Sequence, residues 1–394
     1  MKEIDGGICA VRGVRAGGIK SGKMGLAVII ADGSAAGLFT RNKVIAAPNI
    51  ITRERLQKSG HLGAVIANSG NANAFTGENG LADAKEMSYI LSKETGVAEE
   101  LIAVASTGVI GRKLDVGWIR EHAGEVIRSL SSSTEGSNAA AHAIMTTDTV
   151  LKESAVELDS GVRIGGIAKG SGMIEPDMGT MLAFIYTDAD LSADVLDSCL
   201  RIAVDKSFNM IVVDGDTSTN DMVLLTATAS ASIEPTIEEF QIGLNHVLTS
   251  LAIKIARDGE GATKLIEARV MGAGTDNDAR LVAKTIVRSS LVKSAVFGKD
   301  PNWGRVVAAI GYSGAIVEQE KISLSFASGE EVVHLVERGM ILDPTSNATN
   351  ALKNIMEKEE LVIMVDLGVG DKNATAWGCD LTYDYIRINA EYTT

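Results

Sequence analysis

The chain has 394 residues, enough for two or three domains with a sizeable core, and its 45% hydrophobic and 22% charged residues are typical of a globular protein. The formal net charge of −14 argues against nucleic-acid binding, because proteins that bind nucleic acid usually present a basic face. Three scattered cysteines and five histidines argue against a disulfide framework and a zinc site. Without a signal-peptide segment or a long apolar run, we expect a cytoplasmic protein that has no membrane partner.

The N-terminal part of the chain is typical of short strands separated by glycine turns. Residues 25–30 and 35–40 are the expected arms of a hairpin around a turn at 31–34. A short helix is expected at 52–59, with Thr52 as its N-cap.

Strands and helices alternate through the rest of the chain. The sequence predicts strands at 63–67, 101–105, 146–157, 162–168, 181–186, 210–213, 222–229, 264–270, 322–326, 361–366 and 385–394. It predicts helices at 81–95, 115–131, 138–145, 192–207, 237–258, 276–290 and 347–358. This alternation, without a nucleotide-binding glycine motif, predicts an α/β fold in which β-sheets lie between helices.

Several polar loops follow these strands. The asparagine-rich loop 68–77 can satisfy backbone groups or bind a polar ligand. Thr107 and Gly108 offer a hydroxyl donor beside an unhindered backbone N–H, which are the parts of an oxyanion hole. Glu260, between two glycines, lies on an exposed, flexible turn where it could meet an ammonium ion. Each pattern is also common in ordinary turns.

The most informative stretch runs from Lys169 to Ala189 and contains the dipeptide Gly179-Thr180 in front of an apolar strand. A small residue before threonine allows the strained peptide from which the hydroxyl can attack the preceding carbonyl. After cleavage Thr180 has a free α-amine, whose ordinary pKa of roughly 7.7–8.0 suits a general base. The stretch therefore indicates a self-cleaving enzyme with an N-terminal threonine, although Gly-Thr alone is also common before core strands.

Motifs in a fixed order extend this pattern over essentially the whole chain. They are residues 68–73, 106–111, 144–149, 168–176, 214–221, 257–263 and 387–389. Together they resemble the ornithine acetyltransferase (glutamate N-acetyltransferase) family of arginine biosynthesis. The chain departs from the family at the cleavage point, where the usual Asn-Met-Ala-Thr is Asp177-Met178-Gly179-Thr180. Glycine keeps the residue small, whereas Asp177 adds a carboxylate that leaves the rate of cleavage open.

The resemblance implies a role for individual residues. Thr180 would be the nucleophile and the first residue of a C-terminal beta chain, 180–394, after an N-terminal alpha chain, 1–179. Thr107 and Gly108 would form the oxyanion hole. The residues implied in substrate binding are Thr146 or Thr147, Lys169, Thr180, Glu260, Asn389 and Thr394. The choice between the two adjacent threonines stays open.

The resemblance also implies the reaction and the assembly. The acetyl group of N-acetylornithine would pass through an acetyl-Thr180 intermediate to glutamate, without a metal or organic cofactor. The fold would be shared with some self-processing aminopeptidases, and the cleaved chains would form a heterotetramer of two alpha and two beta chains. An N-terminal-threonine amidohydrolase or aminopeptidase that transfers to water, a catalytically silent binding protein and acetyl-CoA as a second donor stay open as alternatives.

Overall fold

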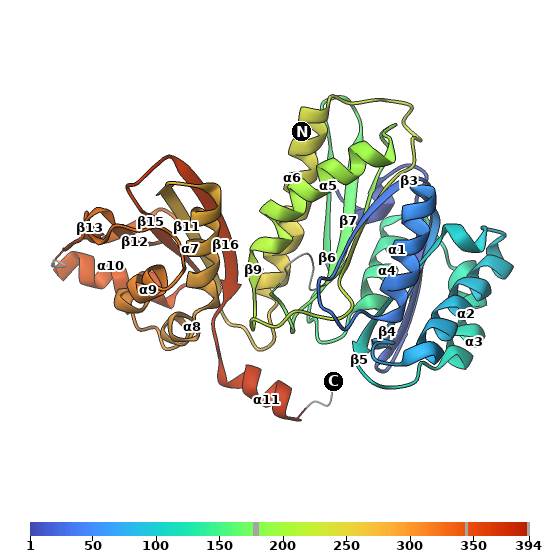
Figure 1. Cartoon of the computed structure of the whole chain (residues 1–394), viewed down its shortest axis with the longest axis horizontal. Coiled ribbons are helices and arrows are strands. Elements are labelled where there is room, and N and C mark those ends of the chain that lie inside the picture. Colours follow the sequence, from blue (N-terminus) through green and yellow to red (C-terminus); the bar gives the residue numbers. More distant parts are fainter. Residues whose placement is uncertain (176–180, 343–345, 392–394) are drawn as a thin grey trace. The chain divides into compact units, whose positions relative to one another are not determined.

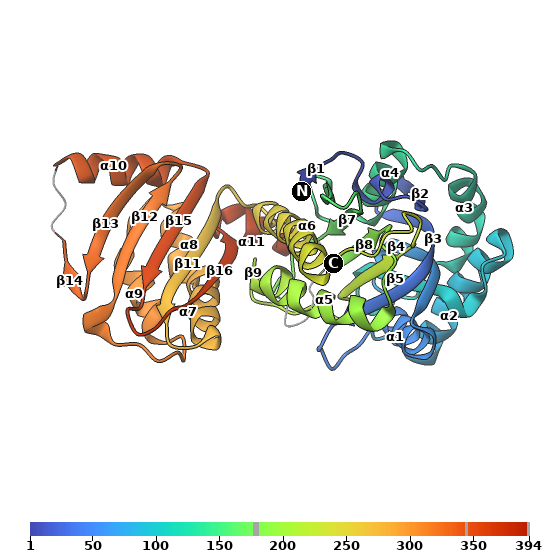
Figure 2. The ribbon, with the colours of Figure 1, turned by 90° about the horizontal axis from the view of Figure 1, so that it is seen from above.

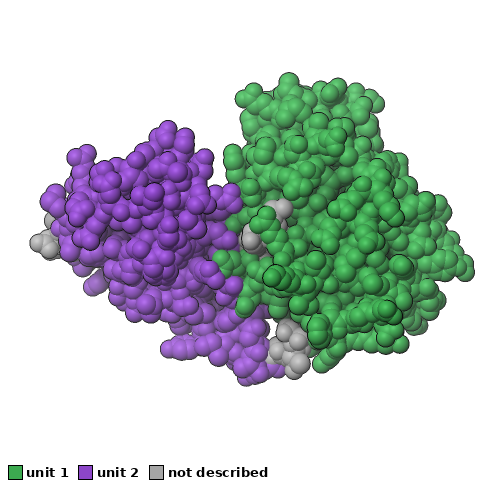
Figure 3. All heavy atoms as spheres, viewed as in Figure 1, with its two compact units in different colours: residues 1–209, 216–255, 393–394 green, residues 210–215, 256–392 purple. Residues whose placement is uncertain are grey.

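The computed structural model describes residues 1–175, 181–342 and 346–391. The chain divides into two compact units, which Figure 3 shows in different colours. Unit 1 contains Met1–Asn209 and Asp216–Ile255, whereas unit 2 contains Met210–Gly215 and Ala256–Tyr392. Each unit has its own β-sheet.

In the described residues, unit 1 contains a mixed sheet with the strand order β1-β6-β7-β8-β10-β3-β4-β5, and β2 pairs with β3. Its strands are β1 (Lys2–Glu3), β2 (Arg15–Ser21), β3 (Met24–Phe39), β4 (His61–Asn71), β5 (Ile102–Val109), β6 (Lys152–Glu157), β7 (Arg163–Lys169), β8 (Leu182–Thr187) and β10 (Met222–Ala227). Its helices are α1 (Ala47–Ser59), α2 (Gly77–Thr95), α3 (Val116–Arg128), α4 (Thr134–Ile144), α5 (Ala193–Lys206) and α6 (Ile237–Arg257), the last of which runs into unit 2 (Figure 1).

Helices cover both faces of this sheet, as the sequence predicts. Side chains alternate between the two faces of a strand, so neighbours in sequence enter different cores. Val28 and Ile66 pack in the core formed with α1, α2 and α3. Ile29 and Ala67 pack in the opposite core, to which α4 contributes. Figure 2 shows α1, α2 and α3 grouped beside β3, β4 and β5.

The hairpin expected at residues 25–40 is wrong, because β3 continues through the predicted turn as a single strand. Its register with β4 shifts between Ile30 and Gly33, where β3 has one residue more than β4 and forms a β-bulge. A Cβ on Gly33 would lie only 1.9 Å from the carbonyl oxygen of Ala227, so glycine is needed where β10 approaches. The glycine therefore marks close backbone contact between strands, a meaning that the turn pattern does not distinguish.

The expected N-cap at Thr52 is also wrong. Helix α1 begins at Ala47, with Pro48 in its first turn, where a missing N–H costs little. Thr52 lies inside the helix, and its hydroxyl donates to the carbonyl oxygen of Val104 and accepts from the Val104 N–H, both at 2.8 Å. This threonine therefore joins α1 to β5.

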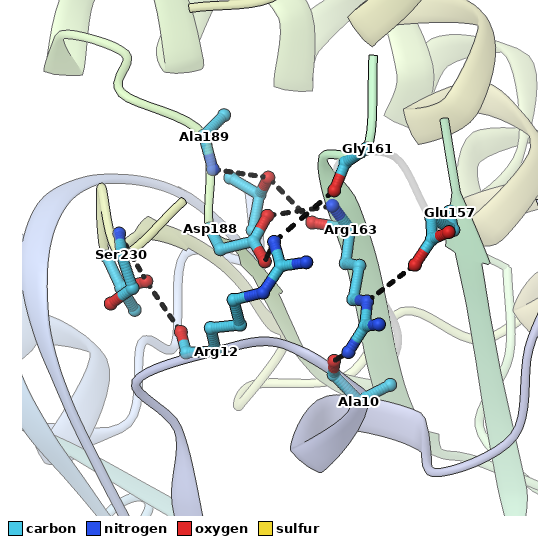
Figure 4. A network of polar contacts seen from close by, with 10 residues as sticks. Ala10, Arg12, Glu157, Gly161, Arg163, Asp188, Ala189 and Ser230 are labelled. Carbon is cyan, nitrogen blue, oxygen red and sulfur yellow. Dashed lines mark hydrogen bonds and ion pairs between the residues drawn. The ribbon is translucent and has the colours of Figure 1, made fainter. Parts of the chain in front are cut away.

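A polar network around the buried Asp188 fixes the N-terminal loop against the β7–β8 hairpin (Figure 4). Arg12 Nη1 donates to Asp188 Oδ2 at 2.9 Å, and the backbone N–H of Arg163 donates to Asp188 Oδ1 at 2.7 Å. Arg163 also donates from Nε to Glu157 Oε2 at 2.8 Å and from Nη1 to the Ala10 carbonyl at 3.3 Å. These contacts anchor β7, the strand that ends at Lys169.

In the described residues, unit 2 contains a second sheet with the order β14-β13-β12-β15-β11-β16-β9. Its strands are β9 (Ile211–Val212), β11 (Leu265–Ala273), β12 (Ser323–Ser328), β13 (Glu331–Glu337), β14 (Met340–Ile341), β15 (Glu360–Asp366) and β16 (Lys372–Cys379). Its helices are α7 (Asp276–Arg288), α8 (Ser290–Phe297), α9 (Trp303–Gly311), α10 (Ser346–Glu357) and α11 (Tyr383–Glu391). Figure 2 shows β13, β12, β15, β11 and β16 side by side.

The strands of unit 2 show the period-two burial of a sheet covered on one face. In β11 the side chains of Ile266, Ala268 and Val270 are buried, whereas Arg269 and Met271 are exposed. Helix α7 packs on β11 and β16, and α10 packs on β12 and β13. Two sheets with helices packed on them confirm the α/β class predicted from the sequence.

The strand expected at residues 385–394 is wrong for the described residues, which form α11. The hydroxyl of Thr382 accepts a hydrogen bond from the Tyr385 N–H at 3.2 Å, as an N-cap does. A strand needs a neighbouring strand to satisfy its backbone, whereas a helix satisfies its own. Residues 392–394 lie outside the described part.

Candidate active site

Lys169 connects three segments of unit 1 that the sequence singled out. It ends β7, is only 8% exposed, and donates from Nζ to Thr107 Oγ1 at 3.1 Å and to Thr146 Oγ1 at 2.9 Å. Thr107 belongs to β5. Thr146 lies in the loop after α4, so the expected start of a strand at residue 146 is wrong, because β6 begins only at Lys152. The fold thus collects two hydroxyls and an ammonium from distant parts of the sequence.

Gly108, beside Thr107, has a backbone conformation that demands glycine. Its φ is +128°, and a Cβ there would lie 2.4 Å from the backbone carbon of Gly70 in the paired strand β4. Glycine at this position therefore lets the backbone of β4 pack closely beside Thr107.

Asp148 holds the Thr146 loop and the end of β7 together. Its Oδ2 accepts from the Thr146 N–H at 3.0 Å, and its Oδ1 accepts from the Gly170 N–H at 2.7 Å and from Lys152 Nζ at 2.8 Å. Both side chains of the Asp148–Lys152 pair are fully buried. Burial alone would raise the pKa of Asp148, but the charges of Lys169 and Lys152 and the hydrogen bonds from Lys152 and Gly170 lower it to about 2. Sequence reasoning missed this residue, which lies within the 144–149 motif.

The two adjacent threonines differ in their contacts. Thr146 receives the bond from Lys169 and donates its N–H to Asp148, whereas Thr147 is half-buried beside it. The lysine thus selects Thr146 as its partner.

A second lysine lies beside this cluster. Lys20, in β2, donates from Nζ to Ser69 Oγ at 2.9 Å and to the carbonyl oxygen of Met145. Burial lowers the pKa of Lys20 to about 8, opposed by the charge of Asp148 and reinforced by that of Lys169. Neither composition nor motif spacing pointed to this residue.

The asparagines of the 68–77 loop serve the fold. Asn68 Oδ1 accepts from Ser106 Oγ at 2.5 Å, and Asn73 Nδ2 donates to the Gly80 carbonyl at 2.9 Å. Asn220, just before β10, donates to the carbonyls of Ala72 and Ser106 at 2.6 and 2.8 Å. Of the two possibilities for this loop, satisfying backbone groups is therefore the one observed for these amides.

Asp221 is a buried carboxyl of a different kind. It is 1% exposed, and its Oδ2 has no hydrogen-bond partner in the described part of the chain. Burial raises the pKa of Asp221 well above its usual range, although nearby Ser218, Thr40 and Lys169 oppose the shift. The neutral acid is therefore favoured here, in contrast to Asp148.

In unit 2, Glu260 is held in place rather than exposed on a flexible turn, so that expectation is wrong. It is 7% exposed, and its Oε2 accepts from Asn389 Nδ2 at 2.8 Å. The flanking glycines allow close packing: a Cβ on Gly259 would lie 2.7 Å from Cys379 Sγ, and one on Gly261 would lie 2.6 Å from the Tyr385 nitrogen. Gly261 also has a φ of +68°.

Two buried side chains of the 380–382 segment hold the Glu260 turn. Asp380 Oδ1 accepts from the Thr263 and Lys264 N–H groups at 2.8 and 3.0 Å. Thr382 donates from Oγ1 to the Gly261 carbonyl at 2.7 Å. The turn and α11, which provides Asn389, are thus tied to one segment.

The remaining site residues named from the sequence, Gly179, Thr180 and Thr394, lie outside the described residues, as does Asp177. Among the residues described, no group of three or more His, Cys, Asp or Glu side chains could hold a metal ion. None of the helices found there combines the length and apolar composition needed to cross a membrane.

The sequence profile of the ArgJ family matches residues 11–394. The chain belongs to the ArgJ family. This confirms the resemblance inferred from the ordered motifs, which is the same family under its enzymatic name.

Relatives with that family's names match along their whole length. A protein named glutamate N-acetyltransferase from Methanosarcina mazei is 65% identical and covers 100% of both chains. One named arginine biosynthesis bifunctional protein ArgJ, from Archaeoglobus fulgidus, is 50% identical over 98% of this chain and 100% of its own. A solved ArgJ chain from Bacillus halodurans is 43% identical, with a TM-score of 0.50, and covers 53% of this chain and 98% of its own.

Proposed function

We propose that this ArgJ chain is a glutamate N-acetyltransferase of arginine biosynthesis, which moves an acetyl group from N-acetylornithine to glutamate. The observation on which this depends is the end-to-end match to proteins named for that activity, at up to 65% identity among the relatives described above. The Lys169 cluster supports it chemically, because an ammonium and hydroxyl groups suit an amino-acid substrate with a carboxylate and an amide.

The nucleophile in this proposal is Thr180, released by self-cleavage after Gly179. Cleavage gives an alpha chain, 1–179, and a beta chain, 180–394, and it frees the amine that serves as general base. The solved Bacillus halodurans chain supports this division, because nearly all of it aligns with only about half of the present chain. A fragment that begins at Thr180 would have a similar length.

Transfer then takes two steps through one acyl-enzyme. Thr180 Oγ attacks the acetyl carbonyl, its proton passes through the α-amine to the leaving nitrogen, and the C–N bond breaks to release ornithine. The glutamate amine attacks the acetyl ester, the C–O bond breaks, and the proton returns to Thr180 Oγ. Thr107 and Gly108 stabilise the oxyanion in both steps; losing one such donor typically costs about 100- to 1,000-fold in kcat.

Charge complementarity assigns the binding roles. Lys169, with Thr146 or Thr147, binds the carboxylate that both substrates share. Glu260, with Asn389 and Thr394, binds the ammonium of the ornithine side chain. In each assignment the protein side chain carries the charge opposite to that of the substrate group it binds.

The test is an acetyl-transfer assay with purified protein. With N-acetylornithine as donor, sustained release of ornithine should require glutamate and should be matched by the formation of N-acetylglutamate. Release of acetate at the same rate without glutamate would instead identify an amidohydrolase. Replacing the donor with acetyl-CoA decides whether the chain is bifunctional, as the name of the Archaeoglobus fulgidus relative states for that protein.

A further inference from the structure

The ammonium of Lys20 forms no ion pair within the described part of the chain, although the charge of Asp148 lies near enough to act on it. Its two acceptors, Ser69 Oγ and the Met145 carbonyl, are neutral. The neighbouring buried Lys152, in contrast, pairs with Asp148 at 2.8 Å. A half-buried lysine without a carboxylate partner is suited to an anion that arrives from outside.

The position of Lys20 relates it directly to the Lys169 cluster. Ser69 is the register partner of Thr107 across the parallel β4–β5 pair, so their side chains lie on the same face of the sheet. Met145 immediately precedes Thr146. The partners of Lys20 are thus neighbours of the partners of Lys169, and the two lysines belong to one polar cluster of unit 1.

Positive charge is concentrated in this cluster. Lys20 and Lys169 each donate to neutral hydroxyl groups, whereas Lys152 is paired with Asp148 inside the fold. Two ammonium groups close enough for the charge of one to act on the other fit a ligand with more than one negative group.

We propose that Lys20 binds the side-chain carboxylate of glutamate, the group that N-acetylornithine lacks. The inference rests on the proposed function and adds the determinant of the acceptor. Both substrates present one carboxylate next to the reacting nitrogen, which Lys169 binds. Glutamate brings a second carboxylate where ornithine brings an ammonium, so the acceptor step needs a second cation. Lys20 is that cation.

If Lys20 has a purely structural role, a different result is expected. Lys20 donates to Met145, which ends α4, and a cation at a helix C-terminus stabilises the helix modestly. Such a role would change thermal stability without distinguishing the two substrates. Lys58, exposed in the last turn of α1, offers a matched control for a lysine at a helix end.

The experiment compares Lys20→Met, Lys20→Arg and Lys58→Met in steady-state assays with N-acetylornithine and glutamate. For Lys20→Met we expect the KM for glutamate to rise about 10- to 100-fold, the loss typical of a charge-assisted hydrogen bond. The KM for N-acetylornithine should stay within about twofold. Lys20→Arg should retain most of the glutamate affinity, and Lys58→Met should match the wild type.

Glutamine as acceptor completes the test from the substrate side, because it replaces the side-chain carboxylate with a neutral amide. The wild-type enzyme should prefer glutamate to glutamine, and Lys20→Met should lose most of that preference. If Lys20→Met does not fold, the preference for glutamate over glutamine is compared between Lys20→Arg, which keeps the charge, and Lys20→Gln, which removes it. Equal changes for both donor and acceptor, or an unchanged preference, would overturn the role of Lys20. A wild-type enzyme that acetylates neither acceptor would instead refute the proposed function.

Discussion

At the scale of single residues, the buried Asp148–Lys152 pair links the protonation of one carboxylate to folding. The pKa of Asp148 is about 2 in the folded chain, below the ordinary value of roughly 3.9. A lowered pKa means that Asp148 stabilises the fold above the unfolded value and loses that contribution as pH falls towards 2. We therefore expect unfolding free energy to fall between about pH 4 and pH 2.

Asp148→Asn should remove this pH-dependent contribution and cost about 3–5 kcal/mol at pH 7, because Lys152 then stays buried without its carboxylate. Urea unfolding of the wild type, Asp148→Asn, Lys152→Met and the double variant measures both effects. The double variant should lose less than the sum of the two single changes. Additive losses would show that the two groups do not stabilise each other.

Glu260 offers the sharpest single-residue test of substrate recognition. Glu260→Gln keeps an oxygen for Asn389 to donate to but removes the negative charge. We expect kcat/KM for N-acetylornithine to fall about 10- to 100-fold, while self-cleavage survives. If the variant keeps wild-type kcat/KM, Glu260 does not bind the substrate ammonium.

At the scale of elements, the Glu260 turn depends on two glycines that let it pack against the 379–385 segment. Gly261→Ala should cost about 2–5 kcal/mol, because it adds left-handed strain and a contact with the Tyr385 nitrogen. Gly96→Ala is the matched control, since Gly96 has a φ of +76° but open space around it. It should cost only the strain, roughly 1–2 kcal/mol. Equal costs by thermal unfolding would show that the packing of the turn contributes nothing.

Elements with strong local signals were predictable from the sequence. The helix expected at 81–95 and the strand expected at 162–168 are both present, because apolar periodicity and the positive-φ glycines that follow and precede them, Gly96 and Gly161, decide them locally. The bulge at Gly33 and helix α11 were not predictable in this way. Gly33 depends on its contact with β10, and α11 depends on the absence of a neighbouring strand, which are tertiary facts.

The site shows the same limit. Thr107, Thr146 and Lys169 could be named only through the resemblance to a family, since each alone is an ordinary residue at a loop or strand end. Their meeting depends on long-range pairing that no local pattern encodes. Asp148 and Lys20 were missed because their role comes from burial and from partners distant in sequence. Asp148 lies within the recognised 144–149 motif, and that motif was the signal in the sequence that could have pointed to it.

At the scale of the whole molecule, the proposal requires a cut chain that stays together. Denaturing gels should show fragments 1–179 and 180–394, whereas size-exclusion chromatography should show both in one particle, expected as two alpha and two beta chains. Thr180→Ala should give the uncut precursor, because the hydroxyl that attacks the Gly179 carbonyl is gone. A fully active preparation that remains one intact chain would contradict this mechanism.

The acyl-enzyme tests the central claim most directly. The cleaved protein is incubated with N-acetylornithine in the absence of glutamate, and the intact mass of each fragment is measured. We predict one added acetyl group, located on Thr180 of the beta chain and removed when glutamate is supplied. An enzyme that transfers acetyl to glutamate at full rate but never holds the acetyl group, or holds it on another residue, would contradict the account.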